Sequence, residues 1–163
     1  MEGKKIGDST VVLTMIMQPQ DANMAGNIHG GVIMKHIDNA AAVTSLKHAK
    51  TNIVTASIDR LSFHHPVFVG DMLTIMSSIN MTGKSSMEVG VRVESENLLN
   101  GQIHHIASAY LTMVALDMHG KPTDVPPILP VTEDELRRNG EAIDRKKTRA
   151  LERIREEKHQ KGS

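Results

Sequence analysis

The chain has 163 residues, with 19 basic and 19 acidic side chains and no cysteine. Its length fits one domain with an appendage, and its hydrophobic content of 39% excludes a wholly disordered chain. The balance of charge argues against a general nucleic-acid binder, which normally carries a basic excess. The lack of cysteine excludes disulfides and thiolate metal sites.

The sequence also bears on the location of the protein. Its first residues contain no apolar core of signal-peptide length. No stretch approaches the ~18 consecutive apolar residues of a membrane span. Together with the absence of cysteine, these features lead us to expect a cytoplasmic protein with no membrane span.

The first 50 residues predict a strand, a turn-rich segment and a helix. Residues 10–17 are mostly apolar and β-branched and end before Pro19, which indicates a strand. From about residue 31 to residue 48, apolar positions recur at intervals of three and four, which predicts a helix. The residues on this face are Ile33, Ile37, Ala40, Ala41 and Thr44. Because its polar face is poor, we expect the helix to be substantially buried.

Four further strands are predicted, over residues 52–63, 72–81, 86–95 and 103–117. Apolar and polar residues alternate over 86–95, which predicts a strand with one buried face and one solvent-exposed face. The residues expected on the solvent-exposed face are Glu88, Gly90, Arg92 and Glu94. Asn100-Gly101 indicates a hairpin before the last strand. The last strand is apolar on both sides, so we expect a second sheet face or an edge to meet another subunit.

Residues 131–163 differ in composition, with 10 basic and 8 acidic side chains. Thr132 and Glu135 have the spacing of a capping box, which predicts a helix start. The sequence therefore predicts a domain over residues 8–130 and a charged helical tail over 131–163. One buried helix against a mostly antiparallel sheet is an α+β architecture.

Asp38 is the first candidate for chemistry, because it lies within the smooth, apolar part of the predicted helix. Burial would raise the pKa of a carboxyl group there and make it a better base near neutral pH. Alternatively, Asp38 lies on a narrow exposed stripe and is satisfied by Lys35 or by solvent.

The glycine-rich segment directly before the helix is the second candidate. Gly30 and Gly31 would leave backbone N–H groups bare at the helix start, where they suit a carbonyl oxygen that gains negative charge. Alternatively, the glycines only allow close packing. Asp38 and Gly31 are ~10 Å apart along one helix, so they would meet only if two copies of the helix ran antiparallel in a dimer.

Four segments resemble the hotdog-fold acyl-CoA thioesterases. They are MQPQDANMAGNIHGGVIMKHIDNAA, NIVTASIDRLSFHHPVFVGD, TGKSSMEVGVRVE and VALDMHGKPTDVPP, in that order. The similarity covers roughly residues 15–130. It implies a long helix wrapped by an antiparallel sheet, paired into double-hotdog dimers and assembled as a trimer of dimers. It also implies hydrolysis of acyl-CoA to fatty acid and CoA, with CoA as part of the substrate and no separate cofactor or metal.

The resemblance assigns roles to four positions around the helix. Asp38 corresponds to the family's essential carboxylate, which acts as a general base or a nucleophile. Asn27 corresponds to a polar position opposite that carboxylate, from the other subunit. The Gly31 amide would polarise the thioester carbonyl. Phenylalanine is common where His29 stands, so His29 is given no catalytic role.

The resemblance also implies residues that bind the substrate. The turn at 83–86 falls where the family contacts the CoA nucleotide and phosphates, although its sequence also suits an ordinary hairpin. In the tail, Arg145 and Arg149 could reach a phosphate, but a solvated helix face is the simpler account. The residues expected around the substrate are Gly30, Thr55, Ser57, Gly83, Lys84, Ser85 and Ser86.

Other functions stay open at this point. A hotdog-fold dehydratase would act on acyl thioesters with a histidine and an acid, and a sensor would bind acyl-CoA without turnover. A serine hydrolase is disfavoured because no G-x-S-x-G motif is present. A metal site is also disfavoured, because the neighbours in His64-His65 and in His104-His105 would point to opposite faces of a strand.

Overall fold

The computed structural model describes residues 1–161, which form two compact units that divide between Leu129 and Pro130. The first unit contains a five-stranded antiparallel sheet and one long helix, α1 (Gly30–Ala49). The strand order is β2-β4-β5-β6-β3, so β2 and β3 are the edge strands. The strands are β2 (Val11–Ile16), β3 (Asn52–Ile58), β4 (Met72–Thr82), β5 (Ser86–Glu96) and β6 (Ile103–Leu116).

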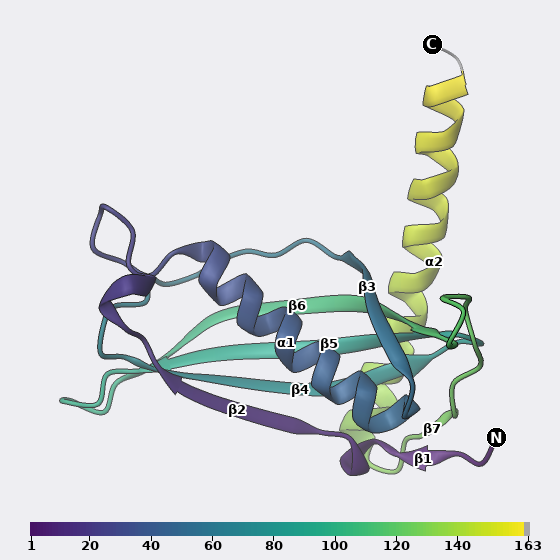
Figure 1. Cartoon of the computed structure of the whole chain (residues 1–163), viewed down its shortest axis with the longest axis horizontal. Coiled ribbons are helices and arrows are strands. Elements are labelled where there is room, and N and C mark those ends of the chain that lie inside the picture. The colour runs from purple at the N-terminus through teal and green to yellow at the C-terminus, as the bar shows by residue number, and fades with distance from the viewer. Residues whose placement is uncertain (162–163) are drawn as a thin grey trace. The chain divides into compact units, whose positions relative to one another are not determined.

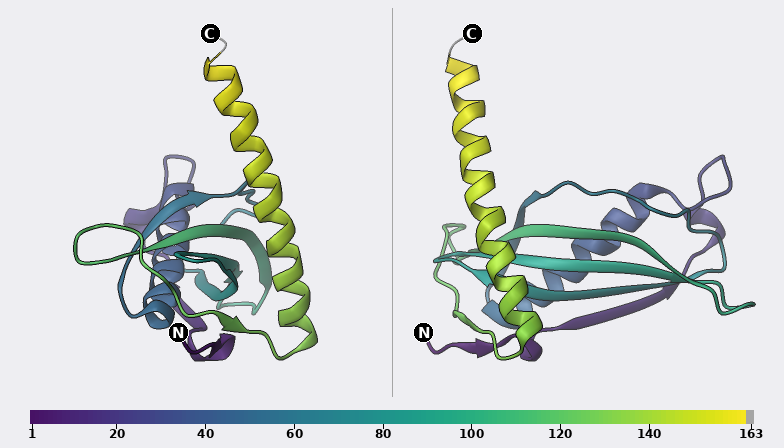
Figure 2. Two further views of the ribbon diagram at one scale, coloured as in Figure 1. Left: turned by 90° about the vertical axis from the view of Figure 1, so that its right-hand side faces the viewer. Right: turned by 180° about the vertical axis from the view of Figure 1, so that it is seen from behind.

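The sheet curls around α1, which crosses one of its faces (Figure 1 and Figure 2). All five residues of the predicted apolar helix face are buried, at 0–3% exposure. Ser77 on β4 donates to the carbonyl oxygen of Ala40 over 3.1 Å, and its hydroxyl also contacts that of Thr44. Alternating residues of β4, β5 and β6 complete the core. The expected α+β architecture is therefore confirmed.

The strand expected over residues 52–63 is shorter than predicted, because β3 ends at Ile58. Its ladder to β6 is interrupted between Thr55 and Ser57, where the register shifts. Beyond Ile58 the backbone still donates to β6, from Asp59 to Tyr110 and from His64 to Ile106, both over 2.9 Å. The segment thus follows β6 without a regular ladder.

The prediction that Glu88 lies on the solvent-exposed face of β5 is wrong, because this residue is only 1% exposed. Its Oε1 accepts a hydrogen bond from the Asn80 amide over 3.3 Å. A Cβ on Gly90 would lie only 2.6 Å from the Asn80 amide nitrogen. The missing side chain at Gly90 therefore makes room for Asn80 to reach Glu88.

Short elements tie the start of the first unit to its end. β1 (Lys4–Lys5) pairs in parallel with β7 (Ile128–Leu129). Two 3-10 turns follow, η1 (Ile6–Asp8) and, after β2, η2 (Pro19–Asp21). The Lys4 ammonium donates to the carbonyl oxygen of His48 in the last turn of α1, over 2.7 Å.

The second unit contains the helix α2 (Glu133–Lys161). The predicted capping box is confirmed: Thr132 Oγ1 accepts from the Glu135 N–H and Glu135 Oε2 accepts from the Thr132 N–H, both over 3.1 Å. Ion pairs three or four residues apart run along the helix, such as Arg137 with Glu141. Within residues 1–161, neither α1 nor α2 has the length and apolarity needed to cross a membrane.

His48 is a buried titratable group in the last turn of α1. Its Nε2 lies 2.7 Å from the carbonyl oxygen of Pro126, so this nitrogen carries the proton. Its Nδ1 has no hydrogen-bond partner within residues 1–161. Burial lowers the pKa of His48, because the charged ring would lose its water.

We predict that His48 destabilises the fold as the pH falls below about 6.5. Between the lowered pKa of His48 in the folded protein and about 6.5, its pKa in the unfolded chain, the unfolded chain binds more protons than the folded protein. The free energy of unfolding is therefore highest above pH 6.5, and it declines across this pH range by at most about 1.4 kcal/mol per pH unit. Thermal unfolding at pH 7.5, 6.5 and 5.5 measures this. His48→Gln should flatten the decline, whereas His119→Gln, an exposed control, should not. Parallel pH curves for the wild type and His48→Gln would contradict the prediction.

Candidate functional site

The carboxylate of Asp38 is held by a hydroxyl from the neighbouring edge strand. Asp38 lies in the middle of α1 and is half-buried. Thr55 Oγ1, on β3, donates to Asp38 Oδ1 over 2.6 Å. A hydrogen bond to a charged acceptor fixes the direction of the carboxylate and leaves its second oxygen available. The structure therefore brings together two of the residues expected at the site.

β3 presents this pair at an open edge of the sheet. Within residues 1–161 the strand has β6 on one side and no strand on the other. Its sequence, NIVTASI, has no charged residue, and Val54 and Ile58 are 41% and 37% exposed. An uncharged edge of this kind is a template for pairing with another chain. Ser57 lies beyond the register shift on the same strand and is exposed.

The N-terminus of α1 is a second polar feature. Its N-cap residue, His29, makes no side-chain capping bond, and no acidic residue lies in the first turn. The N–H groups of Gly30 and Gly31 have no partner within residues 1–161. A Cβ on Gly31 would meet nothing within 4 Å, so open space lies beside it. These bare amides, at the positive end of the helix dipole, suit an anion or a polarised carbonyl oxygen.

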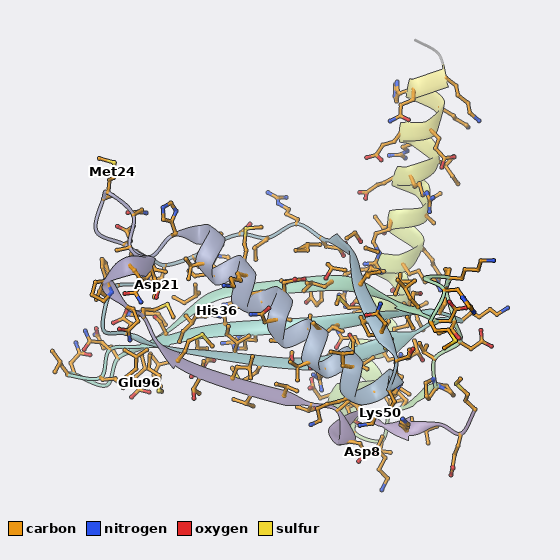
Figure 3. All side chains as sticks on the ribbon, in the orientation of Figure 1. Asp8, Asp21, Met24, His36, Lys50 and Glu96 are labelled. Atoms are coloured by element: carbon orange, nitrogen blue, oxygen red, sulfur yellow. The ribbon has the colours of Figure 1, made fainter. Side chains whose placement is uncertain are left out.

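The loop before α1 carries two asparagines. Asn27 is half-buried and its backbone bridges to Phe68, while its side-chain amide is unpaired within residues 1–161. Asn23 donates from its backbone to the carbonyl oxygen of Asn27 over 2.7 Å, and its Oδ1 accepts from the Ala25 N–H over 2.9 Å. Met24 lies at the tip of this loop, beyond the N-terminal end of α1 (Figure 3).

The turn at 83–86 joins β4 to β5. Gly83 donates to the Ser86 carbonyl oxygen over 2.7 Å, while the carbonyl oxygens of Lys84 and Ser85 accept from Val125 and Ala115, both over 2.9 Å. The backbone is therefore fixed, the Lys84 side chain is exposed, and both serines are half-buried.

The strand register places this turn near the Asp38–Thr55 pair. Thr55 pairs with Met113 on β6, and Met113 pairs with Met87 on β5, just after the turn. Two strand spacings, ~10 Å, therefore separate Thr55 from the start of β5.

Within one chain the expected residues stay in separate groups. Asp38 and Thr55 touch, but no hydrogen bond links them to Asn27 or to Gly31. Gly31 is ~10 Å from Asp38 along the helix. Arg145 and Arg149 lie on α2, in the second unit. Within residues 1–161, no group of three or more His, Asp or Glu side chains is placed to hold a metal ion.

Two residues near these groups were not singled out from the sequence. A methyl group on Gly30 would lie 3.5 Å from Cε2 of Phe63, so this ring borders the start of α1. His36, on α1, is half-buried, and burial lowers its pKa while the charge of Asp21 opposes this shift. Figure 3 shows His36 on the helix and Asp21 near its N-terminal end. Phenylalanine occurs only twice in the chain, which is the one sequence signal that marked Phe63.

Comparison with known proteins identifies the family. The model of the "Thioesterase superfamily" matches residues 25–101. The chain is 38% identical over 138 residues to YkhA of Bacillus subtilis, an uncharacterized acyl-CoA thioester hydrolase, with 85% of this chain and 80% of that protein covered. A hexameric acyl-CoA thioesterase is 41% identical, with a TM-score of 0.90 and coverage of 93% and 97%. The chain belongs to the thioesterase superfamily and has its hotdog fold.

An acyl-CoA hydrolase of Staphylococcus aureus is also similar. Its structure with butyryl coenzyme A, coenzyme A and coenzyme A disulfide is 35% identical, has a TM-score of 0.87 and covers 95% of this chain and 94% of that one. Three further structures of that enzyme carry alanine in place of an asparagine, an aspartate and a threonine. These positions follow one another at intervals of 15 and 17 residues.

Proposed function

We propose that this protein hydrolyses acyl-CoA thioesters to free fatty acids and CoA, with Asp38 as the general base. The observation that carries the proposal is the half-buried Asp38 carboxylate held by Thr55 at an open strand edge, in a chain of the thioesterase superfamily. A carboxylate that is partly shielded and oriented by one donor can accept a proton from water with its free oxygen.

The reaction balances with this one carboxylate. Asp38 takes a proton from a water molecule as the water oxygen attacks the thioester carbonyl carbon. The carbonyl oxygen becomes an oxyanion, which the Gly31 amide stabilises. The intermediate collapses, the carbon–sulfur bond breaks, and the CoA sulfur receives the proton from Asp38. As an alternative, Asp38 attacks the carbonyl carbon directly, the carbon–sulfur bond breaks, and the CoA thiolate leaves and takes a proton from water. Water then opens the resulting anhydride, which releases the fatty acid and regenerates the Asp38 carboxylate.

The proposed site requires two chains. Asp38 and Gly31 are too far apart in one copy, and β3 offers an uncharged edge with exposed apolar side chains. Two copies with antiparallel α1 helices would place Asp38 of one opposite the bare amides of the other. A hexameric relative supports further assembly as a trimer of these dimers.

A polar side chain from the second chain would complete the site. Asn27 is the candidate from the sequence, and its amide is unpaired within residues 1–161. Asn23 is a second candidate: Asn23, Asp38 and Thr55 stand at the same two intervals as the three positions replaced in the Staphylococcus aureus enzyme, and Asn27 does not.

The other expected residues fit substrate binding. Lys84 is an exposed cation on a fixed turn, which suits a CoA phosphate, and Ser85 and Ser86 can add hydroxyl donors. We place Gly30 and Ser57 beside the thioester. The proposed mechanism needs no organic cofactor or metal, and acyl-CoA is the small-molecule partner. We place the protein in the cytoplasm.

Replacing Asp38 by Asn should remove most of the hydrolysis, by a factor of 10² to 10⁴, because a positioned base is lost while the size of the side chain is kept. Thiol release from acetyl- to decanoyl-CoA measures the rate, and light scattering checks that the oligomer is intact. Unchanged turnover would reject the base. If the wild type bound acyl-CoA without releasing thiol, the result would favour a sensor. If it hydrated enoyl thioesters, the result would favour a dehydratase.

Thr55→Val should lower kcat by about 10- to 100-fold with a smaller effect on KM, because a hydrogen bond to a charged group contributes roughly 1.5–3 kcal/mol. Thr55→Ser keeps the hydroxyl and should retain most of the activity. Steady-state kinetics on one acyl-CoA compares the two. If Val and Ser variants behaved alike, the hydroxyl of Thr55 would have no role in orienting Asp38.

A further inference from the structure

Phe63 is a large aromatic side chain that stays 44% exposed, and it lies beside the proposed reaction centre. Its Cε2 and Cζ atoms would be 3.5 and 3.7 Å from a methyl group on Gly30, whereas nothing lies within 4 Å of the same position on Gly31. The start of α1 therefore has an aromatic ring beside Gly30 and open space beside Gly31.

The backbone on both sides of Phe63 is anchored. Before it, Leu61 packs against the core. After it, the His64 N–H donates to the Ile106 carbonyl oxygen over 2.9 Å.

Two imidazole contacts hold the same segment against the start of β6. The rings of His64 and His105 have centroids 5.3 Å apart. Those of His65 and His104 stack at 4.3 Å with an interplanar angle of 24°. The doublets that the sequence places on opposite strand faces thus pair with each other across two chain segments.

We infer that Phe63 contacts the acyl chain next to the thioester carbonyl and sets which acyl chains are used; this rests on the proposed function. A ring without charge or hydrogen-bonding groups cannot bind CoA phosphates. Because the adjacent amides would hold the carbonyl oxygen, the ring borders the carbons attached to that carbonyl. Apolar contact there strengthens with acyl length. His104, stacked on His65, is a positioning residue for this ring.

The test compares kcat/KM for acetyl-, butyryl- and hexanoyl-CoA in wild type, Phe63→Leu and Phe63→Ala. Phe63→Ala should lose about 10-fold or more on hexanoyl-CoA relative to acetyl-CoA, and Phe63→Leu less, since Leu restores part of the apolar contact. Leu99→Ala changes a side chain that is 99% exposed at the tip of a hairpin, and it should leave kcat/KM for hexanoyl-CoA relative to acetyl-CoA unchanged. Equal losses on all three substrates, or no loss, would overturn the inference.

A binding measurement separates this inference from the proposed function. S-methyl-CoA and S-hexyl-CoA are thioethers that cannot be hydrolysed, and calorimetry gives their dissociation constants. Phe63→Ala should weaken S-hexyl-CoA about 10-fold and S-methyl-CoA by less than about twofold. If the wild type released no thiol, the proposed function would fail, yet this selective loss would still support the contact. Unchanged binding of S-hexyl-CoA would overturn it.

The positioning role of His104 has its own control. His104→Ala removes the stack on His65 and should shift the preference between hexanoyl- and acetyl-CoA in the same direction as Phe63→Ala, by a smaller factor. His104→Phe keeps a flat ring and should restore the wild-type preference. If His104→Ala left the preference between hexanoyl- and acetyl-CoA unchanged, or if His104→Phe failed to restore it, the ring stack on His65 would have no part in placing Phe63.

Discussion

The hydrogen bond from Thr55 to Asp38 is the contact on which the proposed site depends. It joins the middle of α1 to the edge strand β3 over 2.6 Å. The donor, Thr55, is an exposed residue on β3, an edge strand of the sheet formed within residues 1–161. The charged group is therefore held at the border of the chain rather than in its interior. This position is the one that the proposed two-chain site requires of Asp38.

The N-terminus of α1 supplies the complementary feature. Its first amides lack a side-chain cap, and no acidic residue lies in its first turn, where the positive end of the helix dipole lies. The same helix thus carries a donor site at its start and a carboxylate in its middle, too far apart to share one substrate. In the proposed dimer, an antiparallel pair of helices would remove this separation and would bring Phe63 to the same place. In this proposal one chain would provide the base, and the other would provide the oxyanion donors and the apolar wall.

Local patterns predicted the parts of this structure that depend on near neighbours. The three-and-four spacing from Ile33 to Thr44 predicted the buried helix face correctly, and the Thr132–Glu135 spacing predicted the start of α2. The sequence missed the end of β3 at Ile58, because the apolar residues continue beyond the register shift. The alternating pattern of β5 also predicted that Glu88 is exposed to solvent. The burial of Glu88 depends on Asn80 from another strand and on the space over Gly90, which the pattern does not show. Asp38 stood out as a carboxylate among small apolar residues, whereas the contacts of Thr55 and Phe63 with α1 arise only from folding.

Subunit mixing tests the two-chain site most directly. Asp38→Asn chains are unfolded and refolded with chains that carry both Asn23→Ala and Asn27→Ala, each preparation being inactive alone, and mass spectrometry verifies the mixed dimers. Our account predicts recovery of about a quarter of wild-type thiol release, because half of randomly paired dimers are mixed and each mixed dimer has one intact site of two. No recovery in verified mixed dimers would show that the base and its partners act within one chain.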